Sequence, residues 1–150
     1  MTRIDVVAAV VDQLARALPQ NAASVTREST EDGAAVLLTP TNEHSAEVRI
    51  EVMADLPQVF VNAGRGGVFE VPVEGRRYSD LDALDEIRAI CVAVIHGEFH
   101  ERVWLKGEEV VGGHGVVRIG SSEAGDRWRK LFTNPFTRTV KRSYSYAPYV

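Results

Sequence analysis

Two histidines four residues apart, His96 and His100, are the first residues in this sequence whose types and spacing could do chemistry. On a single helix this spacing places both imidazoles on one face, where they can hold a zinc ion. Here Gly97 stands between them, and glycine commonly ends a helix because it accepts a left-handed backbone. Glu98 also lies one position away from the glutamate of the zinc-protease pattern. We therefore expect no metal and no other cofactor, with His96 at a helix end and His100 exposed on a strand.

Three acids, Asp82, Asp85 and Glu86, could form a pair of catalytic carboxylates. A catalytic carboxylate normally needs burial or a close partner to shift its pKa, and helical periodicity places these three on a solvated arc. The one cysteine, Cys91, falls on the apolar arc of the same segment, which is typical of a small buried hydrophobe. A reactive thiol is favoured instead by a cationic, partly exposed setting.

None of the common catalytic signatures is present in the sequence: there is no G-x-S-x-G elbow, phosphate-binding loop, dinucleotide fingerprint or zinc-type cysteine set. Catalytic groups that lie far apart along the chain remain open. The sequence nevertheless favours binding over catalysis, and we predict that the protein is not an enzyme.

Two glycine-rich stretches are the candidate contact sites for a partner. Residues 64–67 and 112–115 each lie between segments with strand patterns, so we expect two loops whose bases are fixed by a sheet. Two further side chains precede the second stretch by one hairpin and are of types that often dominate binding energy. The predicted partner-binding residues are Arg65, Gly66, Arg102, Trp104, Gly112, Gly113 and His114.

The element that must position these residues is a central helix, predicted from about Asp80 to about His96. Its apolar residues recur at helical spacing and cover roughly half of its circumference. Ser79 is the expected N-cap, with Asp82 three residues later, and Gly97 is the expected C-terminal glycine. The arc comprises Leu81, Leu84, Ile87, Ile90, Cys91, Val92, Val94 and Ile95.

The rest of the chain alternates between helical and strand patterns. Residues 2–18 follow the 3–4 spacing of an amphipathic helix, with Thr2 and Asp5 as a capping pair. Residues 23–73 read as a five-stranded antiparallel meander, and strands follow the central helix, with a short helix expected within residues 121–132 and a last edge strand within 139–146. We predict an α+β fold in which an N-terminal and a central helix pack on a twisted, largely antiparallel sheet of about seven to nine strands.

Composition bounds the class of protein. The 150 residues are 45% hydrophobic and 25% charged, which fits one domain spanning residues 1–150. No apolar run is long enough for a membrane span and no signal peptide is visible, so we expect a cytoplasmic protein without a membrane partner. The net charge is −4, yet six of the 17 basic residues and none of the 21 acids lie from Arg127 onward, which leaves −10 on the first 126 residues. The acidic body disfavours nucleic acid as a partner, because it would repel phosphate.

The element order, small size, acidic body and Gly-rich stretches between strands resemble the small immunity proteins of bacterial polymorphic toxin systems. The resemblance implies a cytoplasmic, non-catalytic protein that binds a cognate toxin domain and blocks its active site. An acidic inhibitor would speed its encounter with a basic toxin. Two alternatives stay open: a secretion-type chaperone or adaptor, and a small-ligand-binding protein or enzyme with a cavity between sheet and central helix.

Overall fold

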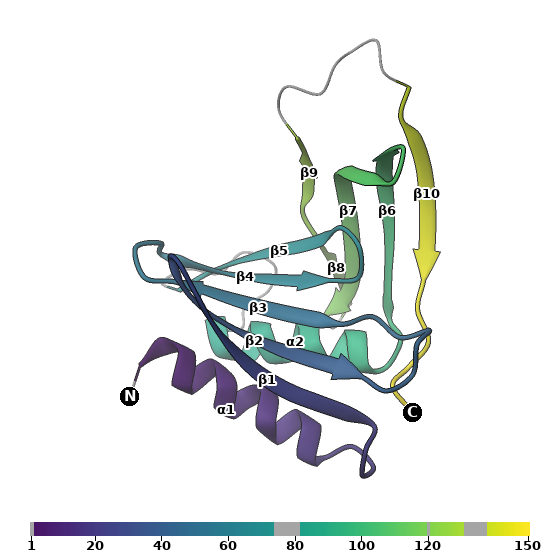
Figure 1. Ribbon diagram of the computed structural model, residues 1–150. Helices are drawn as coiled ribbons and strands as arrows, with labels where there is room; N and C mark the ends of the chain where they lie inside the picture. Colours follow the sequence, from purple (N-terminus) through teal and green to yellow (C-terminus); the bar gives the residue numbers. More distant parts are fainter. Residues whose placement is uncertain (1, 74–81, 120, 131–137) are drawn as a thin grey trace.

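The computed structural model describes residues 2–73, 82–119, 121–130 and 138–150 of the chain. Two helices and ten strands are found in these ranges, and the strands form two antiparallel sheets (Figure 1). The predicted α+β class is confirmed, with the strands divided between two sheets of five. The elements are α1 (Arg3–Arg16), β1 (Ala23–Thr30), β2 (Gly33–Pro40), β3 (Val48–Met53), β4 (Gln58–Ala63), β5 (Gly67–Pro72), α2 (Ala83–Ile95), β6 (Phe99–Lys106), β7 (Glu109–Ile119), β8 (Ser122–Ala124), β9 (Arg127–Arg129) and β10 (Val140–Ser145).

The first sheet is the predicted five-stranded meander, in the order β1-β2-β3-β4-β5. Along β3, β4 and β5, buried and half-buried residues alternate, as a period of two requires when one face meets a core. Both helices lie on the same side of this sheet (Figure 1). The face that they cover is built from buried aliphatic side chains, among them Val36, Leu38, Val48, Ile50 and Val61.

Helix α1 begins where its capping signal predicts. The Thr2 hydroxyl accepts from the Asp5 backbone N–H, and the Asp5 carboxylate accepts from the Thr2 backbone N–H at 3.0 Å. These bonds satisfy donors that the first turn of a helix otherwise leaves unpaired. Val7 and Val11 on the inner side of the helix are fully buried against the core.

Helix α2 ends as predicted and begins three residues later than expected. Asp82 is its N-cap and accepts from the Asp85 backbone N–H at 2.9 Å; the predicted N-cap, Ser79, lies outside the described residues. Gly97 has φ of +73°, and the N–H groups of Gly97 and Glu98 bond to the carbonyls of Val94 and Ala93. This pattern is a Schellman motif, which turns the chain from α2 directly into β6.

The faces of α2 differ from the prediction at two positions. Ile87, Cys91 and Val94 are buried as expected, but Glu86, placed on the solvated arc, is fully buried. Leu84, placed on the apolar arc, is 37% exposed. The helical period assigns each residue to a side of the helix without regard to its neighbours. The boundary between the buried and exposed sides of α2 depends in addition on where neighbouring segments pack.

The second sheet is organised around β7, a strand of 11 residues. β7 pairs with β6 along one side, and its other side pairs with β8 near one end and with β9 further along. β10 pairs with the free side of β6 and forms the predicted edge strand. The short helix expected within 121–132 is wrong, because β8 and β9 occupy the described part of that stretch. In Figure 1 this sheet rises across the end of the first one.

Candidate partner-binding surface

Alternate residues of the second sheet point to opposite sides of it, and we call the side directed away from the core the outer face. Cross-strand partners share a side, so the register defines which residues belong together. Most of the outer residues are exposed, whereas Glu101, Val103 and Leu105 between them in β6 are buried. The outer face comprises His100, Arg102, Trp104, Lys106, Glu109, Gly112, His114, Val116, Arg118, Glu123, Arg127, Arg129, Lys141, Ser143 and Ser145.

The centre of the outer face is a tryptophan surrounded by cationic groups. Arg102 in β6 lies directly opposite His114 in β7, which in turn lies opposite Arg127 in β9. The guanidinium carbon of Arg127 is 6.0 Å from the centre of the half-buried Trp104 ring, at the outer limit of a cation–π contact. Burial lowers the pKa of His114, and the neighbouring Arg127, Arg102 and His100 lower it further.

The outer face is cationic although the chain is acidic. Its positions include six arginine and lysine residues and two acids, Glu109 and Glu123. Glu109 is paired with Lys130, and Lys106 lies opposite it in β6, which together lower the pKa of Glu109. A rigid sheet face with a clear excess of one charge sign attracts a surface of the opposite sign and accelerates its association.

Three of the predicted partner-binding residues, Arg102, Trp104 and His114, therefore lie together on this face. The loop expected at residues 112–115 is wrong, because these residues form the middle of β7. Glycine-rich sequence usually indicates a turn, yet glycine also occurs in strands where another backbone approaches closely. His114 consequently presents its ring from a strand, half-buried, and is not a loop tip.

Gly66 and Gly113 are buried where the two sheets meet. A Cβ atom on Gly113 would lie 2.3 Å from the carbonyl oxygen of Gly66, so only glycine fits the present spacing. The same Gly66 carbonyl accepts from the indole Nε1 of Trp128 at 2.8 Å. Both glycines thus have a structural role, and so does Gly112, which is buried opposite Trp104.

Glu101, on the inner side of β6, fixes the turn between β4 and β5 to the second sheet. Its buried carboxylate accepts from the backbone N–H of Arg65 at 2.7 Å and of Gly66 at 2.8 Å. The Tyr146 hydroxyl donates to the same carboxylate, and burial together with this bond raises the pKa of Tyr146. A buried carboxylate with several donors is compensated, so this cluster holds the loop predicted at residues 64–67 in place.

Arg65, the remaining predicted residue, lies apart from the outer face. Its exposed side chain stacks on Tyr144, with the guanidinium carbon 4.7 Å from the ring centre. In β10, Tyr144 points to the inner side, because it lies opposite Glu101. The structure therefore divides the predicted set. Arg102, Trp104 and His114 face outward, and Arg65 lines a separate polar hollow. Gly66 and Gly113 are packed between the sheets, and Gly112 is buried opposite Trp104 within the second sheet.

The sequence interpretation missed the contribution of β9. Arg127 and Arg129 flank Trp128, and the register places both arginines on the outer face while Trp128 points inward. Alternation of charge and aromatic residue is the signal that could have indicated a strand here. Gly125 also has a packing role, since a Cβ atom there would lie 1.9 Å from the carbonyl oxygen of Gly115.

The described residues contain no group of three or more histidine, cysteine or acidic side chains placed to hold a metal ion. Within those ranges, no helix has the length and apolarity to cross a membrane. Cys91 is fully buried, and desolvation raises the pKa of its thiol to about 12. Such a thiol stays protonated at neutral pH, which leaves it without nucleophilic character.

No protein-family model, curated protein or solved structure matches this chain.

Proposed function

We propose that the chain is a non-catalytic binding protein whose outer face receives an acidic surface of another protein. The observation that carries the proposal is the half-buried Trp104 at the centre of a cationic sheet face, beside Arg127 and close to Arg102. Tryptophan and arginine are enriched among residues that dominate binding energy. The strands hold their backbone in place, so little conformational entropy is lost on association.

The resemblance to immunity proteins suggests what the partner is. In this proposal the partner is a toxin domain, which the chain binds in the cytoplasm and blocks. The acidic body of the chain led us to expect a basic toxin domain. The charge of the outer face favours instead a toxin whose contact surface is acidic. A secretion-type chaperone or an adaptor would use the same face in the same way, with an acidic client in place of the toxin.

A site-specific photo-crosslinker tests the proposal. Ser143 is exposed on the outer face and Gln20 is exposed beyond α1, so benzoylphenylalanine at these positions gives a probe and a matched control. We expect the Ser143 probe to crosslink one protein with an acidic contact surface, and the Gln20 probe to crosslink none. Competition by untagged wild-type chain should abolish the product, whereas competition by an Arg102→Glu/Arg127→Glu chain should not.

Two results would overturn the proposal. Crosslinks from Gln20 that are as strong as those from Ser143 would move the contact away from the outer face. Nuclease-sensitive crosslinks from Ser143 would show that the cationic face binds nucleic acid, for which arginines and an aromatic ring also serve.

A further inference from the structure

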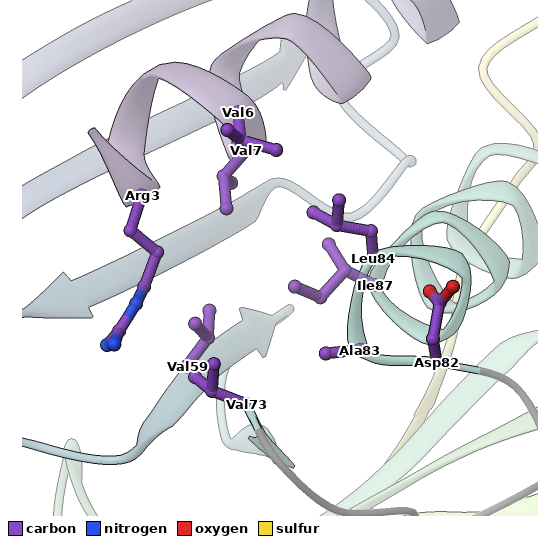
Figure 2. A pocket seen from close by; sticks show the side chains of 9 residues that line it. All are labelled: Arg3, Val6, Val7, Val59, Val73, Asp82, Ala83, Leu84 and Ile87. Carbon is purple, nitrogen blue, oxygen red and sulfur yellow. The ribbon is translucent and has the colours of Figure 1, made fainter. Parts of the chain in front are cut away.

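A recess lies between the first turns of the two helices and the first sheet (Figure 2). None of its described lining residues belongs to the second sheet. Its volume is about 340 Å³, within the range of small-molecule sites. Its walls come from four parts of the chain that are separate in sequence and meet in the folded domain. The apolar lining residues are Val6 and Val7 of α1, Val59 of β4, Val73 after β5, and Ala83, Leu84 and Ile87 of α2.

The recess has a buried, apolar floor and an open mouth. Val7, Val59 and Ile87 have exposed fractions of 1%, 2% and 1%, so they form a floor continuous with the core. Leu84 is 37% exposed, although an α2 residue on an apolar arc is normally covered. An apolar molecule seated on the floor would remove the Leu84 side chain from water as well, which favours its binding.

The charges at the rim indicate which end group such a molecule carries. Arg3 reaches from α1 along the side of the recess, and its Nη1 donates to the Leu56 carbonyl at 3.0 Å. A guanidinium has five N–H donors in a planar fork, and that geometry matches a carboxylate. Asp82 is also at the rim, but its carboxylate points away from the recess in Figure 2 and accepts from the Asp85 backbone N–H.

We propose that this recess binds an aliphatic monocarboxylate of medium chain length. The alkyl chain lies among the valines and against Leu84 and Ile87, and the carboxylate pairs with Arg3. Among the residues that the structure describes, the lining contains no aromatic ring for stacking, and its charged side chains are Arg3 and Asp82. The recess therefore suits a flexible chain with one anionic end. This site goes beyond the proposed protein contact and shares no residue with the outer face.

Calorimetric titration with octanoate tests the inference, and octanol serves as the uncharged probe of the same length. We expect one octanoate per chain, and Arg3→Gln should weaken octanoate binding about tenfold, as loss of one charge-assisted contact predicts. Octanol affinity should not change in Arg3→Gln. Arg16→Gln, in the last turn of the same helix, is the matched control and should bind octanoate as the wild type does. Leu84→Asp should weaken both ligands, because it places a carboxylate at the mouth.

Absence of saturable octanoate binding would overturn the inference. So would binding that Arg3→Gln and Leu84→Asp leave unchanged, since the octanoate would then sit elsewhere. Thermal unfolding of each variant checks that the fold is intact, and both changes are at the rim. Arg102→Glu/Arg127→Glu should bind octanoate with unchanged affinity. The test of the recess is therefore independent of the test of the outer face, and failure of one proposal can be told from failure of the other.

Discussion

The two sides of the second sheet are made by the same strands and have opposite roles. On the inner side, Glu101 and Gly113 join the two sheets through buried hydrogen bonds and close backbone contact. On the outer side, Arg102 and His114 immediately follow them in sequence and face away from the core. Neighbouring residues thus differ in role: one stabilises the fold and the next is available to a partner. We therefore expect substitutions on the inner side to lower stability and substitutions on the outer side to weaken binding.

The largest effect on stability is expected at Glu101. Glu101→Ala removes the acceptor of two backbone N–H groups and of the Tyr146 hydroxyl, and leaves the Gly66 N–H in a buried site and the other two donors in part-buried ones. We expect the free energy of unfolding to fall by about 3 kcal/mol in chemical denaturation. Arg102→Ala, one residue away on the outer face, should change it by no more than about 0.5 kcal/mol. Similar losses of unfolding free energy in both variants would contradict the distinction between a structural inner side and an outer side that does not stabilise the fold.

A smaller loss is expected at Gly113. Gly113→Ala places a methyl group 2.3 Å from the Gly66 carbonyl oxygen, so the two sheets must separate. Overpacking of this kind costs about 2 kcal/mol, measurable by chemical denaturation. Gly112→Ala is the control, since the nearest backbone atom to its new methyl group, the Trp128 carbonyl oxygen, is 3.0 Å away. An equally large loss in Gly112→Ala would mean that close approach of the sheets is not the cause.

The smallest effect concerns the pH dependence of stability through His114. Its pKa is lowered below the ordinary 6.5 in the folded chain, so the unfolded chain binds more protons below that pH. The contribution of His114 to stability is therefore present above pH 6.5 and is lost as pH falls below it. His114→Gln should reduce the loss of unfolding free energy between pH 7 and pH 5, measured by denaturation at both values. An unchanged difference would show that the ring is not held in its neutral form.

Local signals predicted most of the fold. The capping pair of Thr2 and Asp5, the helical spacing of the α2 residues and Gly97 gave both helices, since each signal acts within a few residues. Clean alternation in residues 47–53 and the turn signals between the other segments gave the five-stranded meander. These elements were predictable because the physical cause lies inside the element itself.

The junction of the two sheets was not predictable in the same way. Gly113 has to be glycine because of Gly66, and Glu101 is buried because it receives the N–H groups of a turn far away in the sequence. Such causes become visible only when distant segments meet. For the same reason the structure divides the predicted site residues: Arg102, Trp104 and His114 lie on one sheet face, whereas Gly66 and Gly113 pack between the sheets.

The central claim is that the outer face binds the partner. The most direct test is to measure how tightly a variant with two reversed charges on that face binds the partner. With the partner captured through Ser143, calorimetry at constant salt compares the wild type, Arg102→Glu/Arg127→Glu, and the control Arg16→Glu. We expect the outer-face variant to bind about 100-fold more weakly or worse, while its unfolding free energy changes by no more than about 1 kcal/mol. The control should bind as the wild type does. Equal affinity of the outer-face variant and the wild type would contradict the assignment of the outer face as the binding surface.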